Sequence, residues 1–266
     1  MNYSVVTTFN AQGYEQYGQK MIQTFLANWP AEVELIVYAE NCNVIESAEN
    51  LKVFDLEQAS PELVKFKNQY CNDPRANGQG PDSARKDANK TFKWDAIRFS
   101  HKVYAIAAAA EICKREWLVW MDADMVCHSK ITVADLNRLC PKDRDLCFLG
   151  RKNKFSECGL YAMHINSPST RLFIKKFQSM YNLAETGIFT SSEWHDGYVF
   201  DVVRKTSSLN ELDWTGHIIT GEGHPLINSE WGKYLDHLKG KRKQIGHSLA
   251  KDLINHRIES YWQSVS

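Results

Sequence analysis

The sequence lacks the features that mark membrane, secreted and nucleic-acid-binding proteins. No stretch of its 266 residues reaches about 18 uninterrupted apolar residues, the length that a membrane-spanning helix needs. The opening stretch, MNYSVVTTFNAQGYEQYGQK, has no basic leader before an apolar run, so we expect neither a signal peptide nor a membrane span. Basic and acidic residues balance at 32 each, and this neutrality gives no reason to expect nucleic acid as a partner.

Cysteine is present, but not in the patterns that build disulfide frameworks or zinc sites. The seven cysteines are scattered, odd in number and never spaced as C-x-x-C. Such usage suits a reducing compartment, and we expect a cytoplasmic protein whose cysteines are mostly small buried side chains.

Segments rich in β-branched residues alternate with segments of helical spacing. Strands are predicted at residues 3–9, 33–39, 51–54, 117–121, 146–149 and 160–165, and helices at 14–29, 61–70, 91–115 and 168–181. This alternation predicts an α/β fold with a mixed, mostly parallel sheet flanked by helices. In such sheets ligands bind outside the carboxyl ends of the strands.

One polar segment interrupts this alternation. Residues 71–90, CNDPRANGQGPDSARKDANK, have almost no apolar content and are predicted to form a loop. Because the elements on both sides continue one α/β series, we interpret the segment as a loop excursion within a single domain covering residues 1–266.

The segment WLVWMDADM, residues 117–125, runs from an apolar strand into Asp122 and Asp124, which only Ala123 separates. Carboxylates with apolar flanks are costly unless a cation or a hydrogen-bond network compensates them, and two close carboxylates suit a hard divalent ion. A D-x-D triplet is nevertheless expected about once by chance in this sequence. A second one, Asp143-Arg144-Asp145, reads as a charge-balanced turn. On the segment alone, a metal site and a polar turn are equally supported.

A second candidate lies near the C-terminus, where YLDHLKGKRK places His237, Gly240 and Lys243 in the spacing H-x-x-G-x-x-K. A histidine nitrogen suits Mn²⁺ better than Mg²⁺. A glycine lets the backbone approach a phosphate closely, and a lysine can neutralise that phosphate. The alternative, a basic helix end that faces water, is favoured when this segment is taken alone.

The sequence resembles glycosyltransferases of the GT-A (Rossmann-like) fold, most of all the retaining, glycogenin-like group. The resemblance lies in the order of four features: a VVTTFN strand, a long helix, an apolar strand ending in D-x-D and a late H-x-x-G-x-x-K. The resemblance implies that Asp122, Asp124 and His237 bind Mn²⁺ (or Mg²⁺). It also implies that Gly240 and Lys243 contact the diphosphate of a nucleotide sugar.

The same resemblance extends to the donor and to weaker positions. Residues 230–266 would complete the metal and phosphate site, and the donor would be a UDP-sugar such as UDP-glucose or UDP-galactose. The end of the first strand would hold the nucleoside, Glu40 the base, and Arg98 or Lys102 the diphosphate. Each of these positions also has a structural alternative: the strand-end residues and Glu40 could be ordinary polar residues at a strand end, and Arg98 and Lys102 could lie on a solvated helix face. The expected nucleotide-binding positions are Thr8, Phe9, Asn10, Glu40, Arg98, Lys102 and Ala123, besides the phosphate-binding pair.

Residues 192–198, SEWHDGY, are the candidate for the reacting end, because titratable and aromatic groups gather there before a helical pattern. The resemblance favours function here, so we expect Asp196 and His195 to be catalytic, together with Glu157 before a later strand; Trp194 could stack on a sugar. Asp196 could instead cap a helix, and a core tryptophan is the commoner finding.

The resemblance implies a metal-dependent glycosyltransferase that moves a sugar from a nucleotide-diphosphate sugar to an unknown hydroxyl acceptor, with retention if the histidine motif follows the retaining group. A nucleotidyltransferase would need a glycine-rich, basic loop after the first strand, and TTFNAQGYEQYG has no basic residue. A metal-dependent phosphoesterase would show more His and Asp clusters. A non-catalytic sugar-binding module, which could use the aspartates with Ca²⁺, remains an alternative.

Overall fold

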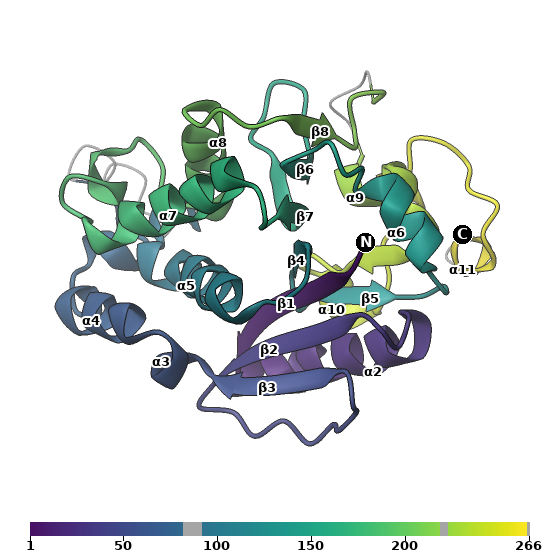
Figure 1. Cartoon of the computed structure of the whole chain (residues 1–266), viewed down its shortest axis with the longest axis horizontal. Coiled ribbons are helices and arrows are strands. Elements are labelled where there is room, and N and C mark those ends of the chain that lie inside the picture. Colours follow the sequence, from purple (N-terminus) through teal and green to yellow (C-terminus); the bar gives the residue numbers. More distant parts are fainter. Residues whose placement is uncertain (82–91, 219–222, 265–266) are drawn as a thin grey trace.

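The computed structural model describes residues 1–81, 92–218 and 223–264. Its centre is a seven-stranded sheet in the order β3-β2-β1-β4-β7-β6-β8 (Figure 1). The strands are β1 Tyr3–Asn10, β2 Glu34–Glu40, β3 Leu51–Asp55, β4 Trp117–Met121, β6 Leu146–Leu149, β7 Glu157–His164 and β8 Glu211–Asp213. The predicted α/β class, with a mostly parallel sheet flanked by helices, is confirmed.

The direction of β7 decides which strand ends share an edge of the sheet. Within β3-β2-β1-β4 every pairing is parallel, and so is the pairing of β6 with β8. Only β7 runs against both of its neighbours, β4 and β6. The carboxyl ends of the other six strands therefore lie along one edge, together with the amino end of β7.

Helices cover both faces of the sheet. Figure 1 shows α4 (Pro61–Tyr70), α5 (Ala96–Ile112), α7 (Pro168–Asn182) and α8 (Asp196–Lys205) on one side, and α2 (Gln19–Asn28), α6 (Val133–Leu139) and α9 (Pro225–Asn228) on the other. Two apolar cores result, and successive strand residues alternate between them: Leu118 and Trp120 belong to the first, Val119 and Met121 to the second. Both faces of β4 are buried, which explains its continuous apolar sequence.

Several boundaries differ from the predicted ones for local reasons. The helix expected over 14–29 begins as a short α1 (Ala11–Gly13) and a π-helical turn (Tyr14–Gly18) before α2. The helix expected over 91–115 starts at Ala96, because the Asp95 side chain accepts the amide of Arg98 and caps it. The strand expected to begin at Leu160 begins at Glu157.

The predicted loop and the cysteines are partly covered by the structure. Residues 71–81 form turns with one 3₁₀ segment, Arg75–Asn77, whereas residues 82–90 lie outside the described residues. Four cysteines are buried, Cys71 is exposed, two are intermediate, and all seven are free thiols. Among the described helices, none combines the length and apolar character that crossing a bilayer requires.

The C-terminal segment is tied back to the end of β4. A two-stranded sheet pairs β5 (Met125–Cys127) with β9 (Leu235–His237) in antiparallel register, so that His237 lies opposite Met125. Asp236 in β9 is fully buried and accepts hydrogen bonds from the backbone and hydroxyl of Ser248 and from the Tyr261 hydroxyl at 2.8 Å. This carboxylate therefore fixes the segment that carries the predicted histidine ligand.

We expect Asp236→Ala to lower the free energy of unfolding by about 2–4 kcal/mol, because four donors, among them three buried ones from Ser248 and the His237 amide, lose their acceptor. Urea denaturation followed by circular dichroism measures the change. Asp143→Ala is the matched control, since the Asp143 side chain is 68% exposed; it should change stability by less than about 0.5 kcal/mol. Equal effects of the two substitutions would contradict this role of Asp236.

Candidate functional site

A cavity of about 360 Å³ opens at the carboxyl ends of β1, β2 and β4. Polar side chains that follow these strands line it, together with residues of α5 and α8 and one lysine from the C-terminal segment. Among its lining residues are the predicted positions Thr8, Phe9, Asn10, Glu40, Arg98, Lys102, Asp122, Ala123, Asp124, Asp196 and Lys243. Folding thus gathers at one cavity most of the residues that the sequence singles out.

The two motif aspartates project from the end of β4 and have different partners. The indole nitrogen of Trp120 donates to Asp122 Oδ1 at 2.8 Å, and Lys102 Nζ lies 2.8 Å from the same oxygen. Asp124 is 2.9 Å from Lys243 Nζ and 3.0 Å from His237 Nε2. The C-terminal segment therefore reaches the motif through both Lys243 and His237.

The chemistry of this donor set fits a divalent cation. Ligand atoms of Asp122, Asp124 and His237 all lie within 4.8 Å of one another. Burial alone would raise the pKa of Asp124, but His237 and Lys243 outweigh it and hold that pKa well below its usual range. Two carboxylates and one imidazole form a set that suits Mn²⁺ better than Mg²⁺, which prefers oxygen ligands and water.

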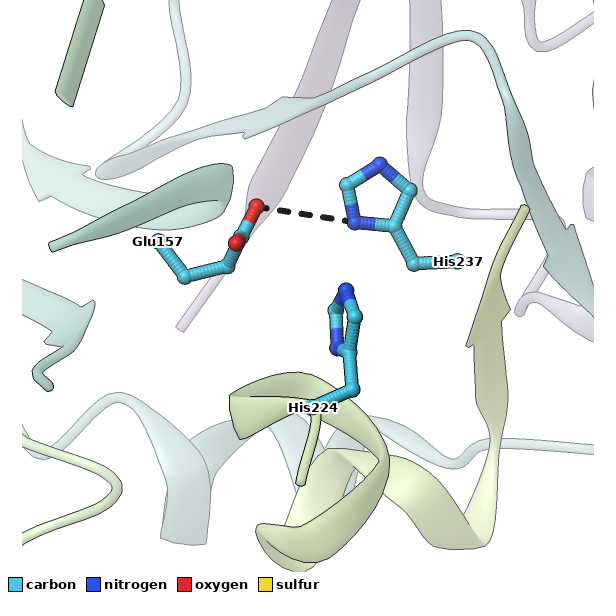
Figure 2. Close-up of side chains that lie close together, drawn as sticks. All are labelled: Glu157, His224 and His237. Carbon is cyan, nitrogen blue, oxygen red and sulfur yellow. Dashed lines mark ion pairs between the residues drawn. The ribbon is translucent and has the colours of Figure 1, made fainter. Parts of the chain in front are cut away.

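Behind the cavity, His237 faces a buried carboxylate (Figure 2). Its Nδ1 lies 3.6 Å from Glu157 Oε1, and no described residue makes a hydrogen bond to that nitrogen. Glu157 is fully buried; Arg151 pairs with one of its oxygens at 2.6 Å and Lys239 with the other. Burial would raise the pKa of Glu157, but its cationic partners, Lys239 first and also Arg151, hold it well below the usual range.

A charged carboxylate next to Nδ1 favours a proton on that nitrogen, which leaves Nε2 of His237 free to face the aspartates. Glu157, His224 and His237 also lie close enough to hold an ion themselves. Glu157 already has two cationic partners, however, and burial lowers the pKa of His224 to about 3, so that ring stays neutral. Support of His237 is the role that this arrangement fits better.

Lys102 connects the motif to the predicted reacting end. The buried ammonium lies 2.5 Å from Asp196 Oδ2 and 2.8 Å from Asp122 Oδ1, and it donates to the Cys158 carbonyl at 2.9 Å. Burial opposes its charge, but the two aspartates raise the pKa of Lys102 well above its usual value. All three N–H groups are used, so the structure places Lys102 as a link between carboxylates rather than as a free diphosphate ligand.

Arg98 remains the cation on α5 that can face a ligand. Its backbone amide bonds to Asp95, but its guanidinium has no carboxylate partner within the residues that the structure describes. Gly240 does not line the cavity; its φ of +58° shows that glycine serves the turn after β9.

Two predicted catalytic residues, His195 and Glu157, do not line the cavity, and Trp194 lies in the core, the commoner position for a tryptophan. His195 caps α8 through the amide of Tyr198, bonds to Glu193 at 2.9 Å, and does not line the cavity. Trp194 is 1% exposed within the core, so it has no free face for a sugar. Glu157 stands behind His237 and not on the cavity wall. The capping role considered for Asp196 belongs to His195, and Asp196 is the first helical residue.

The cavity also contains residues that sequence reasoning missed, among them Tyr17 and His101. Lys243 Nζ lies 4.1 Å from the centre of the Tyr17 ring, a cation–π contact. His101 lies 3.2 Å from Glu40, which also pairs with Lys67. The spacing of Arg98 and His101 along one helix was the available signal, since residues three apart share a face.

Glu40 gives the site a testable pH dependence. The hydrogen bond with His101 lowers its pKa most, burial opposes this, and Lys67 adds to it, so the pKa falls from 4.5 to about 2. Because the folded-state pKa is lowered, its contribution to stability is present above pH 4.5 and is lost as the pH falls towards 2.

We therefore expect Glu40→Gln to be less stable than wild type by about 2–3 kcal/mol near pH 6, with a difference that shrinks in acid. Denaturant titrations at several pH values measure it. Glu49→Gln, at an exposed position, is the control and should track wild type throughout. A constant gap between Glu40→Gln and wild type at all pH values would contradict the assignment.

Comparisons with known proteins return structural likeness only. No protein-family profile matches the sequence, and no curated protein matches it. Among solved structures, the chain is similar to the galactosyltransferase LgtC in complex with donor and acceptor sugar analogs, at 10% identity and a TM-score of 0.49, over 89% of this chain and 87% of that one.

A glycosyltransferase involved in the glycosylation of the major capsid of PBCV-1 is similar at 9% identity and a TM-score of 0.48, over 92% of this chain and all of that one. The bifunctional glycosyltransferase WbbM is similar at 8% identity and a TM-score of 0.47, over 80% of this chain; the chain spans only 39% of that protein. With TM-scores below 0.5, the function of this chain has to be inferred from its own side chains.

Proposed function

We propose that the chain is a metal-dependent GT-A glycosyltransferase that moves a sugar from a nucleotide-diphosphate sugar, with UDP-sugar as the expected donor, to a hydroxyl acceptor. One observation carries the proposal. Asp122 and Asp124 at the end of β4 meet His237 and Lys243 from the C-terminal segment, at the carboxyl edge of the sheet. Such a group supplies metal ligands and a phosphate-binding cation beside one cavity.

Each residue has a part in this reaction. Asp122, Asp124 and His237 would hold Mn²⁺, which stabilises the negative charge that develops on the leaving nucleoside diphosphate. Lys243 and Arg98 line the same cavity and bind the diphosphate. Thr8, Phe9 and Asn10, at the end of β1, bind the nucleoside.

The transfer itself exchanges one bond for another. The bond between the anomeric carbon and the phosphate oxygen breaks, and its electron pair leaves with the nucleoside diphosphate. The acceptor oxygen bonds to that carbon, and its proton passes to an oxygen of the departing nucleoside diphosphate. Lys102 holds the pKa of Asp196 below its usual value although burial would raise it, so a negative charge faces the positive charge that develops on the sugar. The resemblance to the retaining group leads us to expect retention, which NMR of the product would establish.

The metal ligands provide the direct test. With Mn²⁺, wild type should bind a UDP-sugar in a thermal-shift screen and hydrolyse it slowly. Asp124→Asn and His237→Ala should lose most of both activities, because each removes a ligand. Asp143→Asn, in the other D-x-D triplet, should keep them. Equal behaviour of all four proteins would overturn the metal assignment, and retained metal binding without turnover of any nucleotide sugar would favour a sugar-binding module.

The position of His237 can be tested separately from its chemistry. A Cβ on Gly159 would lie 2.5 Å from Cε1 of His237 and 2.7 Å from its Nδ1, so Gly159→Ala must displace the ring. We expect Mn²⁺ affinity, measured by electron paramagnetic resonance, to fall about 10- to 100-fold, as when support of a metal-binding histidine is lost. In Gly216→Ala the nearest atom is 3.6 Å away, so this control should bind Mn²⁺ like wild type. Unchanged affinity in Gly159→Ala would show that the ring position is not limiting.

A further inference from the structure

A second cavity, of about 480 Å³, lies on the other half of the same sheet edge. The first cavity covers the ends of β2, β1 and β4, whereas this one is bounded by Gly150 after β6, by Asp213 at the end of β8 and by Ser156 before β7. The two cavities have no lining residue in common. Because β7 is reversed, its first residue, Glu157, stands between them.

The second cavity is strongly basic although the chain as a whole is neutral. Five basic side chains line it, Arg151, Lys152, Lys154, Arg204 and Lys205, against two acidic ones, Asp201 and Asp213. Such a concentration of one sign in a cleft attracts anions.

Existing bonds engage the two acids to different extents. Asp201 accepts from the Ser156 backbone at 3.0 Å and from its hydroxyl at 2.6 Å, and it pairs with Arg204. Asp213 accepts the amides of Gly150 and Thr215 at 2.9 and 2.8 Å, and both bonds use Oδ1. Both oxygens of Asp201 are therefore occupied, whereas one oxygen of Asp213 can still offset part of the basic charge.

The three lysines have no such compensation. Lys152, Lys154 and Lys205 make no ion pair within the part of the chain that the structure describes. Lys152 and Lys154 flank Asn153, whose φ of 59° marks a tight turn in the loop after β6. Lys205 ends α8 and lines the same cavity. Three exposed lysines from two elements thus line one concave surface, in which basic side chains outnumber acidic ones by five to two.

Arg151 connects this cavity to the proposed reaction centre. It lines the second cavity and pairs with Glu157, and the other oxygen of Glu157 lies 3.6 Å from Nδ1 of His237. A ligand in the second cavity would therefore lie beside the metal-binding histidine, separated from it by one buried carboxylate. Both cavities lie along the same edge of the sheet, on either side of Glu157.

We propose that the second cavity binds the anionic group, a carboxylate or a phosphate, of a saccharide acceptor, with Lys152, Lys154 and Lys205 as its ligands. The acceptor role rests on the proposed glycosyltransferase function. The anion-binding site is inferred from the geometry of the cavity and does not depend on that function.

Binding to three small probes tests the anion site. Glucuronate, glucose 6-phosphate and glucose share one ring but differ in charge, and NMR titration of ¹⁵N-labelled protein gives the affinity and the amides that respond. We expect the charged sugars to shift amides around Gly150 and Thr215, and to bind at least about tenfold more tightly than glucose. Their affinity should fall as salt is raised. The preferred charged sugar tells a carboxylate ligand from a phosphate ligand, and equal binding of all three sugars would overturn the proposal.

A matched pair of triple variants tests the residues. Lys152→Ala/Lys154→Ala/Lys205→Ala should weaken the charged sugars at least about tenfold and leave glucose unchanged. Lys65→Ala/Lys114→Ala/Lys130→Ala removes the same charge at exposed positions outside the cavity and should behave as wild type. Equal losses in the two variants would show a general charge effect and no site.

The acceptor role is tested with Mn²⁺ and the UDP-sugar that binds. The preferred charged sugar should be converted to a glycoside faster than glucose, and the cavity triple variant should lose this preference while still binding the UDP-sugar. An anion that binds in the cavity but receives no sugar would overturn the acceptor role. Failure of wild type to bind any UDP-sugar would instead overturn the proposed function, which keeps the two failures distinct.

Discussion

The site depends on one buried ammonium group. Lys102 lies between Asp122 and Asp196, which come from the end of β4 and the start of α8. Without it, two carboxylates would stand at the edge of the core with no cation between them, a costly arrangement. Because Lys102 extends from the long helix α5, which packs across the sheet, its position is set by the same apolar contacts that form the core. Replacing Lys102 would therefore change both the stability of the fold and the electrostatics of the site.

The second constraint is the reversal of β7. Had that strand run parallel to its neighbours, Glu157 would lie at the opposite edge of the sheet, far from His237. Its reversal brings an acid from the amino end of a strand to the edge where the other strands present their carboxyl ends. The sheet edge thereby carries two cavities: one around the motif aspartates, in which acidic and basic side chains are mixed, and a mostly basic one around Arg151 and the three lysines. The proposed donor and acceptor would occupy these two environments.

The sequence predicts those features of the fold and the site that depend on neighbouring residues along the chain. Apolar strands ending in polar residues are local patterns, so the sheet, the cavity and the placement of Asp122, Asp124 and Asp196 were predictable. Strand direction is not encoded in an apolar run, so the reversal of β7 and the position of Glu157 were not. Side-chain direction is not encoded either: His195 lies beside Asp196 in sequence, yet it turns to cap the helix. Lys102 bonds to Cys158 and Asp196, which lie 56 and 94 residues away along the chain. No sequence pattern predicts pairings over such distances.

The position of His237 shows how these levels combine. The spacing H-x-x-G-x-x-K singles out His237 as a predicted ligand, and the pairing of β5 with β9 brings it opposite Met125, directly after the aspartates. Gly159 in β7 leaves room for the ring, and Glu157 two residues earlier supplies the charge behind it. One strand thus provides both the space and the electrostatic support for a histidine that comes from the C-terminal segment. Since Arg151 of the basic cavity pairs with the same carboxylate, Glu157 is the residue through which the two halves of the sheet edge are in contact.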